Sequence, residues 1–174
     1  MSRQVSRGTA GERPFGFGYA QMRFALSLGG NIGDVETRFT AVESALAAAG
    51  VARICRSRTY ITAPVGCVPG TPDFKNQALT GETDLSPEEL FCLLQSLERS
   101  NGRPAVHSSQ ESRTLDCDLI LWGNEEIHTS LLTVPHPRAR QRQFVLEPLA
   151  EIAPDMEFPD GVTVAQALAA LQKD

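Results

Sequence analysis

The sequence RTLDCDLILWG, residues 113–123, has the two-residue alternation of a β-strand with one face in a hydrophobic core. Two sets of residues alternate along it: Leu115, Cys117, Leu119 and Leu121 on one face, and Asp116, Asp118, Ile120 and Trp122 on the other. Both carboxylates therefore leave the same face, with their Cα atoms about 6–7 Å apart. Two carboxylates held this close repel each other unless a cation lies between them, and Mg²⁺ prefers carboxylate and phosphate oxygens.

The aspartate pair alone fits a half-exposed strand with two solvated side chains equally well. Its neighbours favour a function, because Arg113 precedes the pair and the basic segment VPHPRARQRQF follows at residues 134–144. Positive side chains beside paired carboxylates are typical of a site for a divalent metal and phosphate.

Composition excludes several classes of protein. The chain has 174 residues, of which 41% are hydrophobic, as expected for one globular domain with a substantial core. A net charge of -5 argues against binding nucleic acid through a basic surface, and no apolar run reaches the roughly 20 residues of a membrane span. The four cysteines have no C-x-x-C spacing, which indicates thiols in a reducing cytoplasm.

Residues 1–21 differ in composition from the rest of the chain. They are rich in Gly and Ser, contain three arginines against one glutamate, and have no apolar segment of the secretory type. We therefore expect a flexible N-terminal extension at residues 1–21 and a single catalytic domain at residues 22–174. Met22, immediately before the first strand-like segment, is an alternative start.

Local signals predict the order of the elements. A strand at residues 22–31 ends in a glycine-rich turn, whose spacing fits neither a Walker loop nor a dinucleotide-binding loop. Asp34 is placed to cap a helix that Gly50 ends, and Ser86-Pro87-Glu88-Glu89 begins a second helix with a capping box. Between the helices we expect strands at residues 51–61 and 74–80 with a loop between them. A last short helix is expected near residues 164–171.

The order β-α-β-β-α-β predicts an α+β fold, a ferredoxin-like βαββαβ sandwich. Its sheet would be mainly antiparallel, with the helices packed on one face plus C-terminal additions. The helix-free face would then carry Asp116 and Asp118 and stay open for a ligand.

Several motifs occur together in a particular order. They are SLGGNIGD at residues 27–34, TAPVG at 62–66, FKNQAL at 74–79, Glu98 followed by Gly102-Arg103, RTLDCDLILWGNE at 113–125, and LTVPHPRARQRQFVLEPLAEIAPD at 132–155. In this order and spacing, from Phe24 to about Gly161, the chain resembles the hydroxymethyldihydropterin pyrophosphokinase family of folate biosynthesis. The resemblance implies a monomeric enzyme with two small-molecule substrates, which transfers pyrophosphate from ATP to the hydroxymethyl group of the reduced pterin and releases AMP.

The resemblance also implies roles for individual residues. Asp116 and Asp118 match the positions that hold two Mg²⁺ ions, and Arg103 and Arg113 match the two catalytic arginines. The ATP positions are Gln95, Glu98, Leu119, Thr133, His136 and Arg142. A solvated helix glutamate explains Glu98 nearly as well, and we expect His107 and His128 to lie at the surface without a role.

For the pterin, the resemblance implies contacts by Thr62, Pro64, Val65, Gly66, Phe74, Asn76 and Phe144. A flat ring with donor and acceptor edges needs aromatic faces and amide-type partners. Phenylalanine in a strand is ordinarily a core residue, so Phe74 and Phe144 owe this role to the resemblance. Asn76 differs, because an amide within an apolar strand requires a hydrogen-bond partner.

Departures from the family leave two other functions open. The loop between Arg103 and Arg113 lacks the further basic residues and the tryptophan of many relatives, and Leu131 stands where some have arginine. The first alternative is a kinase making simple phosphoryl transfer, which releases ADP in place of AMP. The second is a ferredoxin-like ligand-binding module that has lost catalysis.

Overall fold

The computed structural model describes residues 21–64, 66–102 and 112–173. The expected N-terminal extension and most of the loop between Arg103 and Arg113 lie outside these ranges. The elements in chain order are β1 (Met22–Gly30), α1 (Val35–Ala48), β2 (Ala52–Arg56), β3 (Tyr60–Thr62), β4 (Phe74–Thr83), α2 (Pro87–Ser100), β5 (Asp116–Trp122), β6 (Ile127–His128), β7 (Thr133–Val134), the 3₁₀ turn η1 (Ala139–Gln141), α3 (Gln143–Ile152) and α4 (Val164–Leu171).

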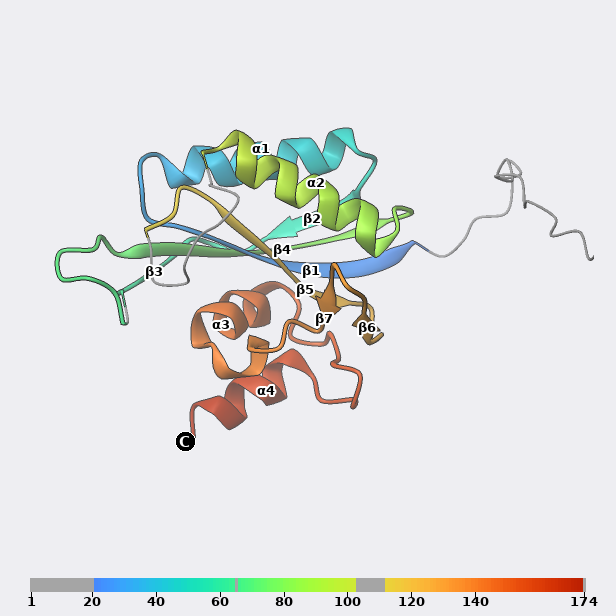
Figure 1. The fold of residues 1–174 in the computed structure, drawn as a ribbon. Helices are drawn as coiled ribbons and strands as arrows, with labels where there is room; N and C mark the ends of the chain where they lie inside the picture. The colour runs from blue at the N-terminus through green and yellow to red at the C-terminus, as the bar shows by residue number, and fades with distance from the viewer. Residues whose placement is uncertain (1–20, 65, 103–111, 174) are drawn as a thin grey trace, which may run out of the picture.

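One antiparallel sheet forms the middle layer of the molecule (Figure 1). Its strand order is β2-β4-β1-β5, with the short strand β3 also paired to β4, while β6 and β7 form a separate ribbon. β1 pairs with β4 on one side and with β5 on the other. The mixed fold and the mainly antiparallel sheet expected from the sequence are confirmed.

Helices α1 and α2 cover one face of the sheet (Figure 1). Asp34 caps α1 by accepting a hydrogen bond from the backbone N–H of Thr37 at 3.1 Å. Ser86 and Glu89 form the expected capping box at the start of α2. The apolar stripes of both helices pack on Phe24, Leu26 and other buried sheet residues, which form the larger hydrophobic cluster. Both helices begin and end close to where their sequence signals predicted.

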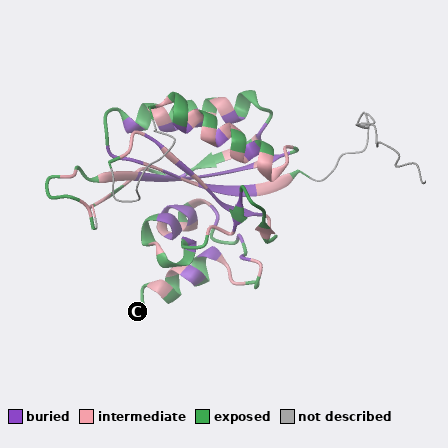
Figure 2. Cartoon of the chain, in the orientation of Figure 1, coloured by how far each residue is buried: buried purple, intermediate pink, exposed green. Residues whose placement is uncertain are grey.

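The opposite face of the sheet is not free of helices, which corrects our expectation. Helices α3 and α4 lie on that side (Figure 1), where Val145, Leu146 and Leu149 pack in a second cluster with Ala78 of β4 and Leu121 of β5. Figure 2 shows the buried residues along the strands and on the sides of the helices that face them. The end of this face that carries the two aspartates stays open as part of a cavity.

A bulge in β5 explains why both clusters receive residues from the end of one strand. The register between β1 and β5 shifts between Ala25 and Leu26, so Ile120 is the extra residue. Beyond the shift, Trp122 packs in the cluster of α1 and α2, and Leu121 packs in that of α3. The simple alternation expected for residues 115–122 therefore holds only as far as Ile120.

Two further expectations need correction. The strand expected at residues 51–61 is divided into β2 and β3. Between them Ser57 stays bonded to Ala78 of β4, but its hydroxyl takes the place of its carbonyl as the acceptor of the Ala78 N–H. The region after residue 134 contains α3, which the sequence did not predict. By contrast, α4 has the bounds that its pattern predicted.

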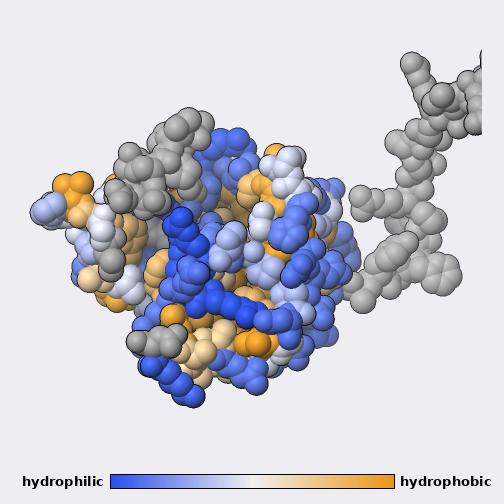
Figure 3. Space-filling model, turned by 60° about the horizontal axis from the view of Figure 1, so that its bottom comes forward, coloured by the Kyte–Doolittle hydropathy of each residue, from blue (hydrophilic) through white to orange (hydrophobic). Residues whose placement is uncertain are grey.

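The surface mixes side chains of both kinds. On the face shown in Figure 3, hydrophobic side chains form separate patches among hydrophilic ones. The large exposed hydrophobic residues lie on different segments: Ile32, Ile61, Val68, Leu131 and Phe144. Among the described residues, no helix is both long and apolar enough to cross a lipid bilayer.

Candidate active site

The sheet register gathers the candidate residues on the face opposite α1 and α2. Asn76 of β4 stands opposite Gly29 of β1, and Gly29 stands opposite Asp116 of β5. In the next row on that face, Ser27 of β1 stands opposite Asp118. Directly opposed residues point to the same side of a sheet, so the amide and both carboxylates share one floor with two small residues between them.

A cavity of about 650 Å³ lies over this floor. It is lined by Ser27, Gly29, Thr62, Ala63, Gly66, Cys67, Phe74, Asn76, Arg113, Asp116, Asp118, Arg138, Arg142, Gln143, Phe144 and Glu147. Strands β1, β3, β4 and β5 supply one wall and the segment around α3 supplies the other. The volume lies within the range typical of sites for small molecules.

At one end of the cavity, positive and negative side chains face each other. Arg113 donates a hydrogen bond from its Nη1 to the Oδ2 of Asp116, and both side chains are largely buried. The arginine compensates one of the two adjacent negative charges. Arg138 and Arg142 line the same cavity and add the positive charge that a polyphosphate requires.

Asn31 holds Arg113 in place, although its sequence context is that of a residue in a glycine-rich turn. Its Oδ1 accepts a hydrogen bond from the backbone N–H of Arg113 at 2.7 Å. Its Nδ2 donates to the carbonyl of Pro72 at 3.2 Å and to the hydroxyl of Ser112 at 3.3 Å. One buried amide thus connects the end of β1 to the segments that precede β4 and β5.

The other end of the cavity suits a flat aromatic ligand. Asn76 is buried and donates from Nδ2 to the hydroxyl of Thr62 at 2.8 Å, which orients its carbonyl oxygen. The ring of Phe144 is 38% exposed, a large apolar surface beside this polar edge. The guanidinium of Arg142 lies 5.5 Å from the centre of that ring. Phe74 completes the apolar lining.

His136 lies beside these arginines and is half-buried. Its Nδ1 accepts a hydrogen bond from the backbone N–H of Arg138 at 3.2 Å, which leaves Nε2 to carry the proton of the neutral ring. Burial, and next the charge of Arg142, lowers the pKa of His136 below its ordinary value of 6.5. Both effects favour the neutral imidazole.

This lowered pKa predicts a dependence of stability on pH. The unfolded chain binds a proton at His136 more readily than the folded chain does, so stability is full above about pH 6.5 and falls as the pH drops below it. We expect the melting temperature to fall less between pH 7.5 and about pH 5.5 in His136→Asn than in the unsubstituted protein. His128→Asn, an exposed histidine, is the control. Equal slopes for the two variants would contradict the prediction.

The structure places the candidate residues in three groups. Nine line the cavity: Thr62, Gly66, Phe74, Asn76, Arg113, Asp116, Asp118, Arg142 and Phe144. Six others are outside its lining: Pro64, Gln95, Glu98, Leu119, Thr133 and His136. Arg103 and Val65 fall outside the described residues, so their predicted roles stay predictions.

Two members of the second group have clear structural surroundings. The carboxylate of Glu98 accepts a hydrogen bond from the backbone N–H of Cys117 at 2.7 Å and so ties α2 to β5. Leu119 is buried in the cluster beneath α1 and α2. A nucleotide contact by either residue remains a prediction.

Sequence reasoning missed several lining residues. Ser27, Gly29, Ala63, Cys67, Arg138, Gln143 and Glu147 all contribute to the cavity. The sequence pattern does not set Arg138 apart from its neighbour Arg140, and Gln143 and Glu147 belong to the helix that was not predicted. Ser27 and Gly29 lie in the motif SLGGNIGD, but no local signal assigns them to the site, because their position there comes from long-range strand pairing.

Comparison with known proteins identifies the family. Residues 25–154 match the family model of 7,8-dihydro-6-hydroxymethylpterin-pyrophosphokinase (HPPK). The chain belongs to the HPPK family. The matched range includes the whole floor of the cavity and all of α3.

Individual relatives agree with this assignment. An enzyme of Synechocystis named 2-amino-4-hydroxy-6-hydroxymethyldihydropteridine pyrophosphokinase is 39% identical over 145 residues, covering 82% of this chain and 73% of the relative. The Bacillus subtilis protein of that name is 41% identical over 135 residues, 76% of this chain and 78% of the relative.

Solved structures support the fold. The chain superimposes on an HPPK-DHPS crystal structure in complex with substrates with a TM-score of 0.65 at 12% identity. The superposition covers 86% of this chain and 43% of that one, so the present chain spans less than half of the solved protein. At this identity the likeness shows the HPPK fold alone.

Proposed function

We propose that this cavity is the active site of the HPPK reaction. In that reaction a pyrophosphoryl group passes from ATP to the hydroxymethyl group of 6-hydroxymethyl-7,8-dihydropterin, and AMP is released. Membership of the family supports the reaction. The observation that carries the assignment of the site is that one cavity joins the Asn76–Thr62 edge to the Asp116–Asp118 pair.

The pterin would lie at the Phe144 end of the cavity. Its ring would stack on Phe144 and Phe74, and the oriented amide of Asn76 would bond to its heteroatom edge. Gly29, between Asn76 and Asp116 in the sheet register, leaves the floor flat for the hydroxymethyl group to reach the carboxylates. A Cβ there would lie 3.4 Å from the Oδ1 of Asn76, so a larger side chain would enter the ligand's space.

The triphosphate would lie over the aspartates, where Arg113, Arg138 and Arg142 supply positive charge. The donor set of Asp116 and Asp118 fits Mg²⁺, because two carboxylates with phosphate oxygens and water complete its preferred ligands. Among the described residues, no group of three or more His, Cys, Asp or Glu side chains could hold a metal alone, which is consistent with substrate phosphates supplying ligands. We therefore propose that two Mg²⁺ ions bind here and, when bound, supply charge that offsets the β-phosphate and the leaving AMP.

The protein's own part in the reaction is positioning and electrostatics. The hydroxymethyl oxygen attacks the β-phosphorus and releases its proton to solvent. The bond from that phosphorus to the bridging oxygen of the α-phosphate breaks, and AMP leaves with this oxygen and its electron pair. The arginines stabilise the charge that develops on the phosphates. Of these, Arg113 is held by Asn31 and Asp116, so it is oriented before the substrates arrive.

Product analysis tests this proposal. The protein is incubated with ATP, Mg²⁺ and the hydroxymethyl dihydropterin, and the nucleotides and pterins are separated by chromatography. AMP and pterin diphosphate in equal amounts would support it. ADP would mean simple phosphoryl transfer, and no pterin-dependent turnover would favour the binding module.

Removal of the Phe144 ring should weaken pterin binding selectively. Stacking on a protein ring contributes up to about 1.5 kcal/mol beyond buried area, so we expect Phe144→Ala to raise the Kd for the pterin by up to about tenfold. The ring is partly exposed, so the melting temperature should change little. Titration calorimetry measures the Kd, and Leu131→Ala, another exposed apolar residue, is the control. An equal effect of the two substitutions would contradict the stacking role.

We also propose the details of the fold, the absence of nucleic-acid binding, the oligomeric state and the localisation. The strand order β2-β4-β1-β5 with α1 and α2 on one face supports a ferredoxin-like core at residues 22–174 with C-terminal additions. The net charge of -5 supports a protein that does not bind nucleic acid. We propose that the enzyme is a cytoplasmic monomer, which sedimentation and cell fractionation would test.

A further inference from the structure

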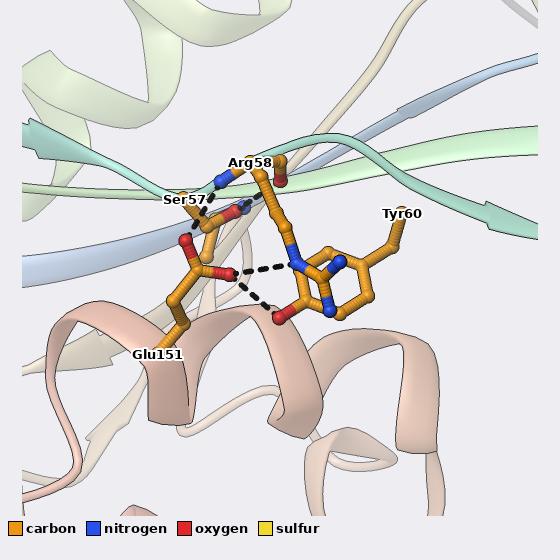
Figure 4. A network of polar contacts seen from close by, with 5 residues as sticks. Ser57, Arg58, Tyr60 and Glu151 are labelled. Carbon is orange, nitrogen blue, oxygen red and sulfur yellow. Dashed lines mark hydrogen bonds and ion pairs between the residues drawn. The ribbon is translucent and has the colours of Figure 1, made fainter.

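One carboxylate joins α3 to the edge of the sheet outside the cavity (Figure 4). Glu151, near the end of α3, accepts a hydrogen bond from the hydroxyl of Tyr60 at 2.6 Å and from the backbone N–H of Arg58 at 3.0 Å. The Nε of Arg58 lies 3.4 Å from the same carboxylate, and its guanidinium stacks over the ring of Tyr60 at 4.3 Å. The three residues form a brace between segments about 90 positions apart in sequence.

The brace acts on the least supported strand of the sheet. β3 pairs with β4 through three residues, and it is separated from β2 by the break at Ser57. Glu151 holds it at two points, the backbone of Arg58 within the break and the side chain of Tyr60 within the strand. The hydrogen bond from Tyr60 lowers the pKa of the Glu151 carboxyl, so the acceptor stays ionised at neutral pH.

Both ends of the brace are connected to the pterin half of the cavity. Tyr60 and Thr62 are two residues apart in a strand and share a face, and Thr62 bonds to Asn76. On α3, Phe144, Glu147 and Glu151 follow one another at spacings of three and four and so share one side of the helix. Phe144 and Glu147 line the cavity, while Glu151 lies beyond its lining.

From this geometry we propose that Glu151 is a positioning residue for the pterin. Its carboxylate holds β3 against α3 and so sets the separation between the Thr62–Asn76 edge and the Phe144 ring. The inference rests on the proposed function, because it assigns those two walls to the pterin. A slot for a flat ring depends on the distance between its walls, and small displacements of a binding wall have large effects.

Substitutions at both ends of the brace test the proposal. Tyr60→Phe deletes one hydroxyl and keeps the ring beneath Arg58, whereas Glu151→Ala deletes the acceptor of both hydrogen bonds and the anion of the ion pair with Arg58. Asp160→Ala is the matched control: Asp160 is also an exposed carboxylate that accepts from an arginine, Arg140, and from a backbone N–H, that of Val162, but none of these residues belongs to β3 or α3.

Calorimetry gives two readouts, the Kd for the hydroxymethyl dihydropterin with a non-hydrolysable ATP analogue and Mg²⁺ present, and the Kd for that analogue alone. We expect Glu151→Ala to raise the pterin Kd about tenfold and to leave the analogue Kd within about twofold. Tyr60→Phe should raise the pterin Kd by a smaller factor. The double variant should bind the pterin no more weakly than Glu151→Ala does. Both substitutions delete the same hydrogen bond between Tyr60 and Glu151, so their effects should not add. Asp160→Ala should alter neither Kd.

Three results would overturn the proposal. They are an unchanged pterin Kd in Tyr60→Phe and Glu151→Ala, an equal rise of both Kd values, or an effect of Asp160→Ala as large as that of Glu151→Ala. If Glu151→Ala does not fold, Tyr60→Phe decides alone. The unsubstituted protein separates the two hypotheses: if it neither binds the pterin nor forms AMP, the proposed function fails and this inference with it, whereas normal activity with insensitive variants refutes only the inference.

Discussion

Asp116→Asn and Asp118→Asn are each expected to lower the rate of AMP formation by at least ~10³-fold while the protein stays folded. The amide keeps the size of the side chain but removes the negative charge that would attract Mg²⁺ and align the polyphosphate. Because the two carboxylates are two residues apart on one face of β5, removal of one charge also relieves their repulsion. For Asp118→Asn the melting temperature should therefore stay the same or rise, whereas Asp116→Asn also breaks the largely buried ion pair with Arg113 and should lower it. The loss of rate should be partly reversed at high Mg²⁺ concentration.

A matched control separates a lost metal site from a general loss of charge. Asp155→Asn removes a carboxylate that pairs with Arg23 at 3.0 Å, and neither of these residues lines the cavity. The rates of AMP release by Asp155→Asn, measured over a range of Mg²⁺ concentrations, should match those of the unsubstituted protein. If Asp116→Asn and Asp118→Asn also keep full rates at low Mg²⁺, the pair does not hold the metal.

Asn31→Ala is expected to lower both stability and turnover. The substitution leaves the backbone N–H of Arg113 without its acceptor and removes the links to Pro72 and Ser112. An unsatisfied buried donor costs about 1–3 kcal/mol of unfolding free energy. Displacement of Arg113 should lower kcat/KM about 10²-fold, because a catalytic group is sensitive to shifts of about 1 Å.

Asn31→Asp separates the two roles of this amide, as acceptor from the backbone of Arg113 and as donor to Pro72 and Ser112. The aspartate can still accept from Arg113 but cannot donate to Pro72 or Ser112, so we expect an effect between those of the original residue and alanine. Denaturant unfolding and steady-state kinetics measure the two effects. Asn124→Ala, at an exposed position after β5, is the control. If kcat/KM is unchanged in Asn31→Ala at a temperature where it is folded, Asn31 has only a structural role.

The sequence predicted the elements whose signals are local. Asp34 and Ser86 cap α1 and α2 with their own side chains, and both helices have apolar stripes. Helix α3 has no such signal, since Arg142 at its start makes no side-chain cap and Pro148 lies inside it. Its stability comes from packing on the second cluster, which cannot be inferred before the sheet is assembled.

The same distinction applies to the site. Asp116 and Asp118 could be selected from the period of a strand, and Asn76 from its apolar neighbours. Ser27 and Gly29 could not, because they join the site only through the register of β1 with β4 and β5. Asn31 follows two glycines and resembles an ordinary turn residue, yet β1 continues through Gly30 and the amide points inward to Arg113.

The bulge at Ile120 limits which changes in length β5 can accept. The extra residue turns Leu121 and Trp122 toward opposite clusters without altering the aspartates at the other end of the strand. Deletion of one residue after the bulge would direct the bulky indole of Trp122 to the side of α3. Point substitutions at residues 121 and 122 should therefore accumulate among descendants of this gene more readily than insertions or deletions in β5.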